Sequence, residues 1–324
     1  MRAIQFTEYG GPEVLKLVSL DKPKPTGREV LIEIKAIGVN YADTARREGE
    51  YVVRTPLPFV VGAEIAGVVV ETGPDVQLLK VGSPVVTLIE SGGYAEFALA
   101  DERAVFPLSE GTDFTQAVAL PLQGLSAYHI LKTTGRLAEG ESVLIHAAAG
   151  GVGLLAVQLA KLFGAGQVIA TASSAEKLAL AKSMGADVLV NYTETEWEKQ
   201  VLEATGNKGV NLALEMVGGE VFHKTLACMA VFGRMVIYGV ASGEPSQFYP
   251  SSLMRKNQTV SGFFLTNILR NPQAIQSSMQ DMLGWLNTGQ LKLTIGGVYP
   301  LEQAQEVHRL LQSRKTSGKL VLTP

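Results

Sequence analysis

The chain has little cysteine and little histidine, and this limits the kinds of site that it can build. Cys228 is the single cysteine among 324 residues, and the chain has four histidines. One cysteine cannot form an internal disulfide, and it cannot supply the thiolates of a cysteine-rich zinc site. We therefore expect no bound metal, and a reducing compartment with the cytoplasm as the default location.

The chain also lacks an excess of positive charge and lacks long apolar runs. It has 28 lysines and arginines against 31 aspartates and glutamates, which gives a formal net charge of −3. Proteins that bind nucleic acids or membrane surfaces through charge are basic, so we expect neither kind of partner. No run reaches about 18 uninterrupted apolar residues, the length of a membrane span, and the first residues lack the pattern of a signal peptide.

Apolar residues are abundant, at 46% of the total, and this excludes bulk disorder. Up to about residue 120 they form short segments rich in valine and isoleucine, several of which alternate with polar residues as half-buried strands do. Clusters of glycine and proline separate these segments. The pattern predicts an irregular, partly barrel-like β domain.

The pattern changes between residues 143 and 265, where short apolar segments alternate six times with segments of helical length and composition. Strands that are almost wholly apolar are typical of a sheet covered on both faces. This part of the chain therefore predicts an α/β fold with a doubly wound parallel sheet.

The last part of the chain reads as two amphipathic helices, at 272–288 and 300–314, followed by a single strand at 318–324. A lone strand needs a sheet to join, so we predict that it folds back onto the first domain. The predicted domains are thus a discontinuous β domain, 1–124 with 267–324, and a dinucleotide-binding domain, 125–266.

A glycine-rich segment, HAAAGGVG at residues 146–153, lies between an apolar strand and a helix, as a dinucleotide fingerprint does. The missing Cβ of Gly150 lets the backbone approach a pyrophosphate, and that of Gly153 lets the helix pack closely on the strand. The first glycine of the usual G-x-G-x-x-G would fall at Ala148. Because backbone N–H groups and the helix dipole favour an anion there, we predict dinucleotide contacts from Ala148, Gly150, Gly151, Val152 and Gly153, with a purely structural turn as the alternative.

The end of the next strand predicts which dinucleotide binds. An NAD site usually places an acid there, but QVIATA is followed by Ser173 and Ser174, and Lys177 comes shortly after them. Neutral donors and a cation suit a 2′-phosphate, and Tyr192 at the end of the third strand adds a hydroxyl. These residues favour NADP(H), with a solvated helical lysine as the alternative reading of Lys177.

Seven segments carry a resemblance that runs through essentially the whole chain: 38–49, 58–73, 92–100, 120–131, 146–161, 182–192 and 317–322, the first reading GVNYADTARREG and the second PFVVGAEIAGVVVETG. On these segments the sequence resembles the medium-chain dehydrogenase/reductase family, and within it the zinc-free quinone oxidoreductase branch. The resemblance implies a GroES-like β domain interrupted by a Rossmann-type domain, with the cofactor cleft between them.

Departures from the zinc-dependent members of this family indicate a different chemistry. Those members have a cysteine where this chain has Asn40 and a histidine where it has Ala63; Glu64 alone makes no metal site. Without a Lewis acid to stabilise an alkoxide, alcohol oxidation is not expected.

The function that these features predict is NADPH-dependent reduction of a small molecule, a quinone or a related α,β-unsaturated carbonyl, by hydride transfer from nicotinamide C4. The resemblance implies that Asn40 lies beside the nicotinamide, where its amide N–H can bond a developing oxyanion, and that Tyr51 lines the acceptor pocket as proton donor or wall. An enoyl-thioester reductase is the alternative, since HAAAGGVG does not separate the two. A non-catalytic NADPH-binding structural or RNA-binding protein is a further alternative that the lack of a basic groove disfavours.

The resemblance also implies further cofactor contacts, including Lys319, which we expect to pair with a phosphate. The others are Ser126, Val217, Gly218, Gly239, Val240, Phe263, Phe264 and Leu265.

Three further expectations concern two buried side chains and one strand of the parallel sheet. His146, at the end of a buried strand, is expected to be a satisfied core histidine, and Cys228, in an apolar helix, a buried inert thiol. Residues 259–265 are expected to form the edge strand of the parallel sheet. A long apolar edge pairs readily with its copy in another subunit, which predicts a homodimer.

Overall fold

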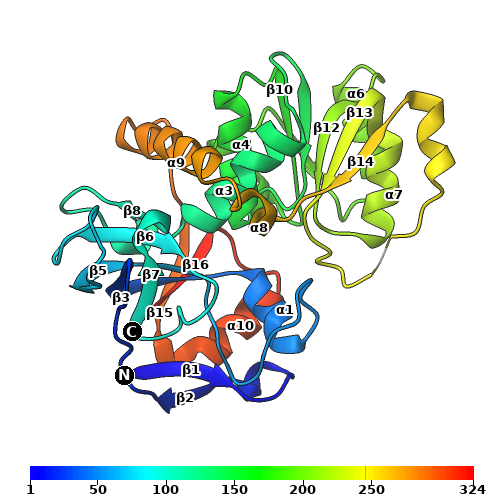
Figure 1. The fold of residues 1–324 in the computed structure, drawn as a ribbon. Coiled ribbons are helices and arrows are strands. Elements are labelled where there is room, and N and C mark those ends of the chain that lie inside the picture. Colours follow the sequence, from blue (N-terminus) through cyan, green and yellow to red (C-terminus); the bar gives the residue numbers. More distant parts are fainter. Residues whose placement is uncertain (245) are drawn as a thin grey trace. The chain divides into compact units, whose positions relative to one another are not determined.

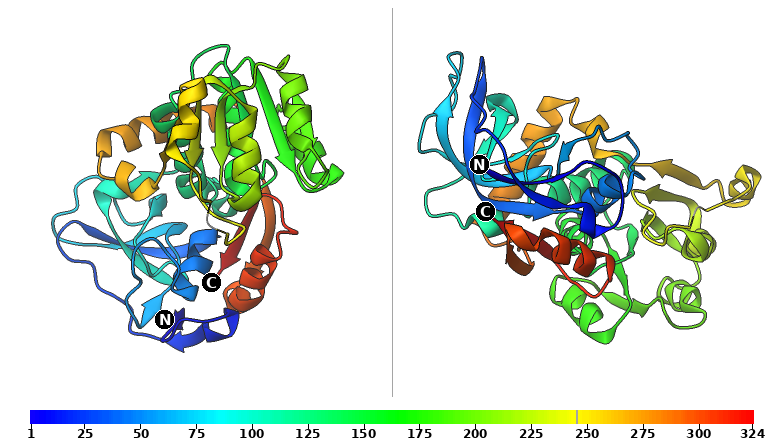
Figure 2. Two further views of the ribbon diagram at one scale, coloured as in Figure 1. Left: turned by 90° about the vertical axis from the view of Figure 1, so that its right-hand side faces the viewer. Right: turned by 90° about the horizontal axis from the view of Figure 1, so that it is seen from below.

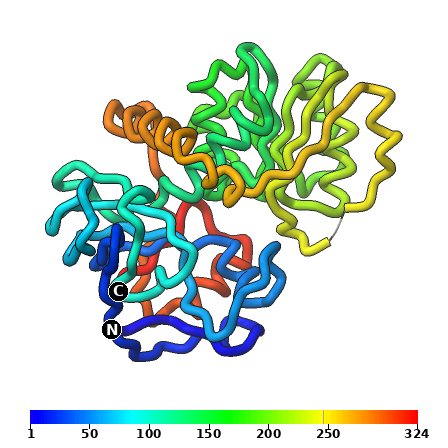
Figure 3. The backbone as a smooth tube through the Cα atoms, viewed as in Figure 1, coloured from blue at the N-terminus to red at the C-terminus, as the bar shows by residue number. Residues whose placement is uncertain are grey.

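The computed structural model describes residues 1–244 and 246–324 and divides into two units. The first unit contains Met1–Leu122 and Leu293–Pro324, and the second contains Gln123–Lys292. Both termini belong to the first unit, and Figure 3 traces the C-terminal segment, in red, back among its blue strands.

The first unit is built on two sheets. One has the order β15-β16-β3-β5-β6-β8, with β7 also paired to β3, and the other has the order β2-β1-β4. The C-terminal strand pairs antiparallel with β3, Leu320 opposite Val39, as the sequence predicted. The bounds are β1 Arg2–Phe6, β2 Lys16–Ser19, β3 Glu29–Val39, β4 Phe59–Val60, β5 Glu64–Thr72, β6 Pro84–Leu88, β7 Phe97–Asp101, β8 Val105–Pro107, β15 Ile295–Pro300 and β16 Lys319–Thr323.

Short helices complete the first unit, and a buried apolar core lies between them and the sheets. Val307 of α10 belongs to this core together with Phe6, Ile32 and Ile65 of the strands. The helical bounds are η1 Pro12–Val14, α1 Tyr41–Glu48, η2 Glu102–Ala104, α2 Phe114–Ala117, η5 Leu301–Gln303 and α10 Ala304–Gln312, while α3 Pro121–His129 begins in this unit and ends in the second.

The second unit contains a six-stranded parallel sheet in the order β11-β10-β9-β12-β13-β14 (Figure 1). This is the doubly wound order that the alternation of strands and helices predicted. The edge strand is shorter than predicted, because β14 ends at Gly262 and Leu265 already begins α8. The strand bounds are β9 Ser142–Ile145, β10 Gln167–Ala172, β11 Val188–Asn191, β12 Val210–Glu215, β13 Met229–Ile237 and β14 Thr259–Gly262.

Helices cover this sheet, and Figure 2 shows them from two further sides. Trp197 and Val201 of α6 and Phe222 of α7 pack with Leu144 and Ile169 of the central strands. Among the described residues, no helix combines the length and the apolar character needed to cross a membrane. The helical bounds are η3 Ile130–Thr134, α4 Gly151–Leu162, α5 Ala175–Ser183, α6 Trp197–Ala204, α7 Gly219–Cys228, η4 Pro250–Lys256, α8 Leu265–Ile268 and α9 Pro272–Asn287.

Helix α9 lies with the second unit, whereas we predicted that residues 267–292 belong to the first. Tyr128 of α3 donates a hydrogen bond to Asp281 of α9 at 2.7 Å, and Ser278 Oγ of α9 lies 3.2 Å from His129 Nε2. The segment's helical character was predicted, but its docking side depends on these contacts with α3, which the local pattern does not contain.

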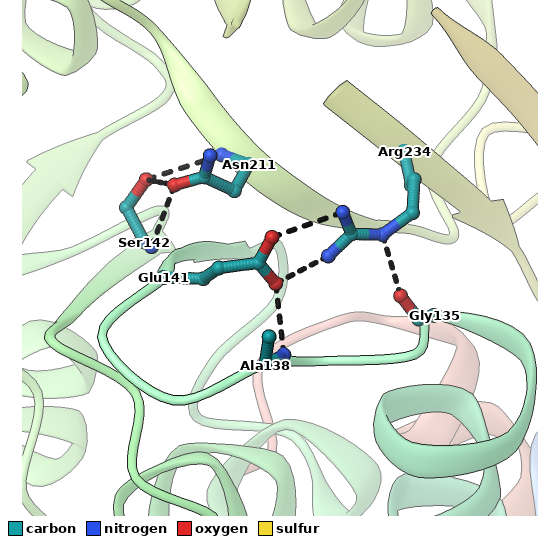
Figure 4. A network of polar contacts seen from close by, with 6 residues as sticks. All are labelled: Gly135, Ala138, Glu141, Ser142, Asn211 and Arg234. Atoms are coloured by element: carbon teal, nitrogen blue, oxygen red, sulfur yellow. Dashed lines mark hydrogen bonds and ion pairs between the residues drawn. The ribbon is translucent and has the colours of Figure 1, made fainter. Parts of the chain in front are cut away.

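A polar network fixes the amino-terminal end of the parallel strands (Figure 4). Arg234 of β13 makes a two-pronged ion pair with Glu141, with Nη1 3.0 Å from Oε1, and Nε donates to the carbonyl of Gly135 at 2.7 Å. Burial favours the neutral carboxyl, but hydrogen bonds from Arg234 and Ala138 outweigh burial and lower the pKa of Glu141. These contacts fix the loop before β9 to β13 at the amino-terminal end of the sheet. The carboxyl end of the sheet takes no part in this network.

His146 follows β9 and is fully buried, as predicted for a core histidine. Thr225 donates its hydroxyl to the Val221 carbonyl at 2.7 Å, so its oxygen accepts from His146 Nε2 at 2.7 Å. Nδ1 then accepts from the hydroxyl of Thr171 at 2.8 Å. The neutral ring satisfies every partner, and burial lowers the pKa of His146 to about 3.

The pKa of His146 makes the stability of the protein depend on pH. The pKa of His146 is lowered in the folded state but has its ordinary value of about 6.5 in the unfolded chain. As the pH falls below this value, the unfolded chain therefore binds a proton at His146 before the folded protein does. The neutral His146 therefore makes its full contribution to the free energy of unfolding above about pH 6.5. By pH 5 this contribution has fallen by about 2 kcal/mol. We expect His146→Gln, compared by urea unfolding at pH 7.5 and pH 5, to lose less stability on acidification than the wild type.

The exposed His223 provides the matched control for this measurement. His223→Gln should reproduce the pH dependence of the wild type. An equally steep acid loss in His146→Gln would show that other groups cause it.

Candidate functional site

The predicted cofactor residues of the second unit lie at one edge of its sheet. Because all six strands are parallel, the segments that follow β9, β10, β11, β12 and β13 start at the same, carboxyl edge. In such sheets ligands bind where the strand order reverses, which is here between β9 and β12. The fold therefore brings together residues 148–153, 173–177, 192, 217–218 and 239–240 at this edge.

The glycine-rich turn after β9 is shaped by contacts within the chain. Ala147 has a left-handed backbone with φ of 48°, and its carbonyl accepts from the N–H of Gly150 at 2.8 Å. A Cβ on Gly153 would lie 2.7 Å from the Cα of Ala148, so only glycine lets α4 pack this closely on the turn. This is the packing role predicted for Gly153.

The same turn leaves the start of α4 suited to an anion. The N–H groups of Gly151, Val152 and Gly153 belong to the first turn of the helix, where no helical acceptor exists. A Cβ on Gly150 would meet only the Ala147 carbonyl, at 3.2 Å, so the chain leaves space beside this backbone. The geometry fits a pyrophosphate. Sequence reasoning missed Gln123, whose side chain lies against Gly151.

The end of β10 presents hydroxyls and a lysine. Ser174 caps α5, and its hydroxyl oxygen accepts from the N–H of Lys177 at 3.3 Å. Burial lowers the pKa of the half-buried Lys177. Ser173 and Tyr192 are half-buried at the neighbouring strand ends. Hydroxyls and a cation are the groups that we predicted for a 2′-phosphate, and their role in binding it stays a prediction.

Two loops after β12 and β13 are bonded to each other. The N–H groups of Ala241 and Ser242 donate to the carbonyls of Met216 and Val217, each at 2.8 Å. The buried carboxylate of Glu215 accepts from the N–H groups of Val217, at 2.7 Å, and Gly218, at 3.0 Å. Burial raises the pKa of Glu215, and these two hydrogen bonds oppose it. Glu215 thus fixes the loop that was predicted to reach the nicotinamide.

The other predicted cofactor residues of this unit differ in exposure. Ser126 is buried on α3, Val240 is half exposed, and the N–H of Phe263 donates to the Ile237 carbonyl at 2.8 Å. The half-buried ones are Gly239, Phe264 and Leu265.

The first unit contains a second polar centre, at Asn40, Glu64 and Lys319. All three are buried, with exposed fractions of 4%, 0% and 1%. The Lys319 ammonium makes an ion pair with Glu64 Oε2 and donates to Asn40 Oδ1 at 2.8 Å. Asn40 Nδ2 donates to Glu64 Oε2 at 3.1 Å and to the Gly38 carbonyl at 3.2 Å. Glu64 Oε1 accepts from the N–H of Leu122.

This centre corrects two expectations. We predicted that Lys319 pairs with a phosphate, but its partners are Glu64 and Asn40 in a buried site. We predicted that Asn40 donates its amide to a developing oxyanion, but both Nδ2 hydrogens already have acceptors. The signal that sequence reasoning missed is a pair of opposite charges, Glu64 and Lys319, each at the start of an apolar strand.

A chain of buried groups extends from Asn40. The carboxylate of Asp43 accepts from the backbone N–H of Asn40 at 2.8 Å and from the hydroxyl of Tyr94 at 3.3 Å. Arginine can only donate, so Arg47 donates to Nδ1 of His308, at 3.2 Å, and Nε2–H of His308 donates to Tyr94, at 3.1 Å. Burial raises the pKa of Asp43 to about 6, and burial with the charge of Arg47 lowers that of His308 to about 3.

Tyr51, the other predicted catalytic residue, lies just after α1. Its ring is half-buried, and the guanidinium of Arg46 lies 4.1 Å from the ring centroid. This cation–π contact holds the ring against the first unit.

In the two described ranges, 1–244 and 246–324, no group of three or more histidine, cysteine, aspartate or glutamate side chains is placed to hold a metal ion.

Comparison with known proteins gives matches along the whole chain. Residues 26–110 match the model of the alcohol dehydrogenase GroES-like domain, and residues 151–287 match that of the zinc-binding dehydrogenases. The quinone oxidoreductase of Pseudomonas aeruginosa is 36% identical over 325 residues, which is 100% of this chain and 99% of the relative.

Solved structures agree with this match. The quinone oxidoreductase of Escherichia coli in complex with NADPH has 33% identity and a TM-score of 0.95, with all of both chains covered. A mycobacterial protein in complex with NADPH has 37% identity and a TM-score of 0.94, again over both whole chains. The GroES-like and Rossmann-type architecture, together with identity of this extent to quinone oxidoreductases, shows that the chain belongs to the medium-chain dehydrogenase/reductase family and to its quinone oxidoreductase branch.

Proposed function

We propose that this protein is a zinc-independent, NADPH-dependent reductase of quinones or related α,β-unsaturated carbonyls. The observation that carries the proposal is the turn at residues 147–153, which leaves an open helix N-terminus at the carboxyl edge of the parallel sheet. The NADPH complexes of two relatives support the choice of cofactor.

Different residues at the carboxyl edge of the sheet would bind different parts of NADP(H). The first turn of α4, from Gly151, would hold the pyrophosphate through backbone N–H groups and the helix dipole. Ser174 and Lys177 would hold the 2′-phosphate. The loop at 216–218, fixed by Glu215, would face the nicotinamide side.

Zinc does not fit the residues of the first unit. The two positions where zinc-dependent relatives carry cysteine and histidine are Asn40 and Ala63, which supply neither thiolate nor imidazole. The one carboxylate there, Glu64, already pairs with the Lys319 ammonium, and that cation would repel a divalent ion. Zinc therefore takes no part in the proposed reaction.

The chemistry must then suit an acceptor that is electrophilic without a Lewis acid. Bound NADPH supplies a hydride from nicotinamide C4, and quinones and enones can place the added electrons on a carbonyl oxygen. The protein needs to position the acceptor and exclude water more than to provide a strong acid–base pair. Tyr51 would line this acceptor pocket, as the resemblance implies.

Stopped-flow measurement of NADPH absorbance with a panel of quinones, enones and an enoyl thioester tests the function. We expect oxidation with quinones or enones. Gly150→Asp should abolish it because a carboxylate there repels the pyrophosphate, while φ of −75° at Gly150 accepts any residue.

Turnover of the thioester alone would assign the protein to the enoyl-thioester reductases. No turnover with any acceptor would contradict the proposal.

Lys177 tests the preference for the phosphorylated cofactor. Lys177→Glu replaces the cation by an anion beside the 2′-phosphate, so the Kd for NADPH should rise by about tenfold or more while that for NADH changes by less than about threefold. Fluorescence titration measures both. Lys182→Glu, an exposed change on the same helix, is the matched control and should change neither Kd. Equal loss for NADPH and NADH would refute the role of Lys177.

We also propose a homodimer that forms through β14. This strand is at the end of the sheet order and pairs only with β13 among the described strands, so its other edge offers free backbone groups. Light scattering should give twice the chain mass of 34.6 kDa at micromolar concentration. A monomer mass would contradict the dimer.

A further inference from the structure

We propose that Gln123 is a further cofactor-binding residue, whose side-chain amide donates a hydrogen bond to a pyrophosphate oxygen at the start of α4. This role rests on the proposed function only through its cofactor, NADP(H). Gln123 and α4 both belong to the second unit, so the first unit takes no part in the contact. Gln123 lies on α3, outside the glycine-rich segment that predicted the other pyrophosphate contacts.

The amide of Gln123 packs on the first residue of α4. A Cβ on Gly151 would lie 2.1 Å from Oε1 and 2.3 Å from Nε2 of Gln123, which is far shorter than a real contact. The backbone of Gly151 does not have a positive φ, so its conformation does not require glycine. What the glycine provides is space, and the amide of Gln123 fills that space at the N-terminus of the helix.

This amide has no hydrogen-bond partner within residues 1–244 and 246–324, although Gln123 is half-buried. A polar group that is withdrawn from water and left without a partner is costly. The N–H groups of Gly151, Val152 and Gly153 at the same helix start also lack a helical acceptor. Donors gathered in one place without acceptors indicate an anionic ligand, and the pyrophosphate is the anion proposed for this place.

Ser126 gives the same face of α3 a second polar group. It lies one helical turn after Gln123, so the two side chains are neighbours on the helix surface. Ser126 is buried, with an exposed fraction of 7%, and its hydroxyl also has no hydrogen-bond partner in the described part of the chain. This face of α3 therefore carries two polar side chains whose hydrogen-bonding capacity the protein itself does not use.

The chemistry of the amide fixes which of its atoms would meet the cofactor. A phosphate oxygen only accepts hydrogen bonds, so Nε2 of Gln123 would face it. Oε1 would then be free to accept from a backbone N–H of the helix start. A side chain that merely fills space over Gly151 needs neither bond, and this difference makes the role testable.

Equilibrium titrations of Gln123→Glu with NADPH and with NADH test the inference. Glutamate keeps the size and shape of glutamine but replaces the donor by a negative charge, which repels the pyrophosphate. Because both dinucleotides contain the pyrophosphate, both Kd values should rise by the same factor, about tenfold or more. Gln276→Glu, an exposed change on α9, is the matched control and should change neither Kd.

Two further variants at the same position separate binding from packing. Gln123→Met keeps the length of the side chain without a donor and should raise both Kd values by about threefold or more. Gln123→Lys keeps a donor and adds a positive charge, so both Kd values should stay at or below those of the wild type. If Gln123→Glu fails to fold, these two variants carry the same test.

The melting temperature of the protein without cofactor is the second readout. Gln123→Glu should not lower it, because a carboxylate is favourable at a helix N-terminus. A lower melting temperature with unchanged Kd values would show that the amide only packs on α4, and would overturn the inference.

Two other binding results would also overturn it. Kd values of Gln123→Glu and Gln123→Met equal to those of the wild type would exclude a hydrogen bond to the cofactor. A loss confined to NADPH would assign Gln123 to the 2′-phosphate instead. A wild type that binds NADPH but reduces no acceptor would overturn only the proposed function, and one that binds neither dinucleotide would overturn both.

Discussion

Six strands that run in one direction are the constraint on which the candidate site depends. Their shared direction places the segments after β9, β10, β12 and β13 at one edge, although these segments are far apart in the sequence. The polar network of Arg234 and Glu141 occupies the opposite end. Helix α4 starts at the carboxyl end of β9, beside the point where the strand order reverses. Its dipole and its first N–H groups face that point.

The first unit is distinguished by charged side chains that are buried away from water. Lys319, Glu64 and Asp43 are ionisable groups that lie almost completely buried around one amide, that of Asn40. Each has hydrogen-bond partners, so their burial is tolerated, and each restricts Asn40 in a different way.

Much of the second unit could be predicted, because its signals are local. The roles of Gly153 and His146 follow from their places between a strand and a helix, and the burial of Cys228 follows from its apolar helix. The buried thiol also has a pKa raised by burial to about 12, in keeping with the inert role predicted for it.

What could not be predicted depends on contacts between distant parts of the chain. Glu64 and Lys319 are 255 positions apart, and no local pattern indicates that they meet. The docking of α9 follows from single contacts such as Tyr128 with Asp281, which an amphipathic pattern does not specify. The occupied amide of Asn40 is likewise a property of its neighbours and not of its place in a motif.

The central claim is that the carboxyl edge of the sheet binds a phosphorylated dinucleotide at the start of α4. Calorimetric titration with NADPH and with 2′,5′-ADP, for the wild type and Gly150→Asp, tests this most directly. The account predicts one site per chain with a micromolar or lower Kd for NADPH, weaker binding of 2′,5′-ADP, and loss of NADPH binding in the variant. Absence of binding to the wild type, or an equal Kd for NADPH in the variant, would contradict it.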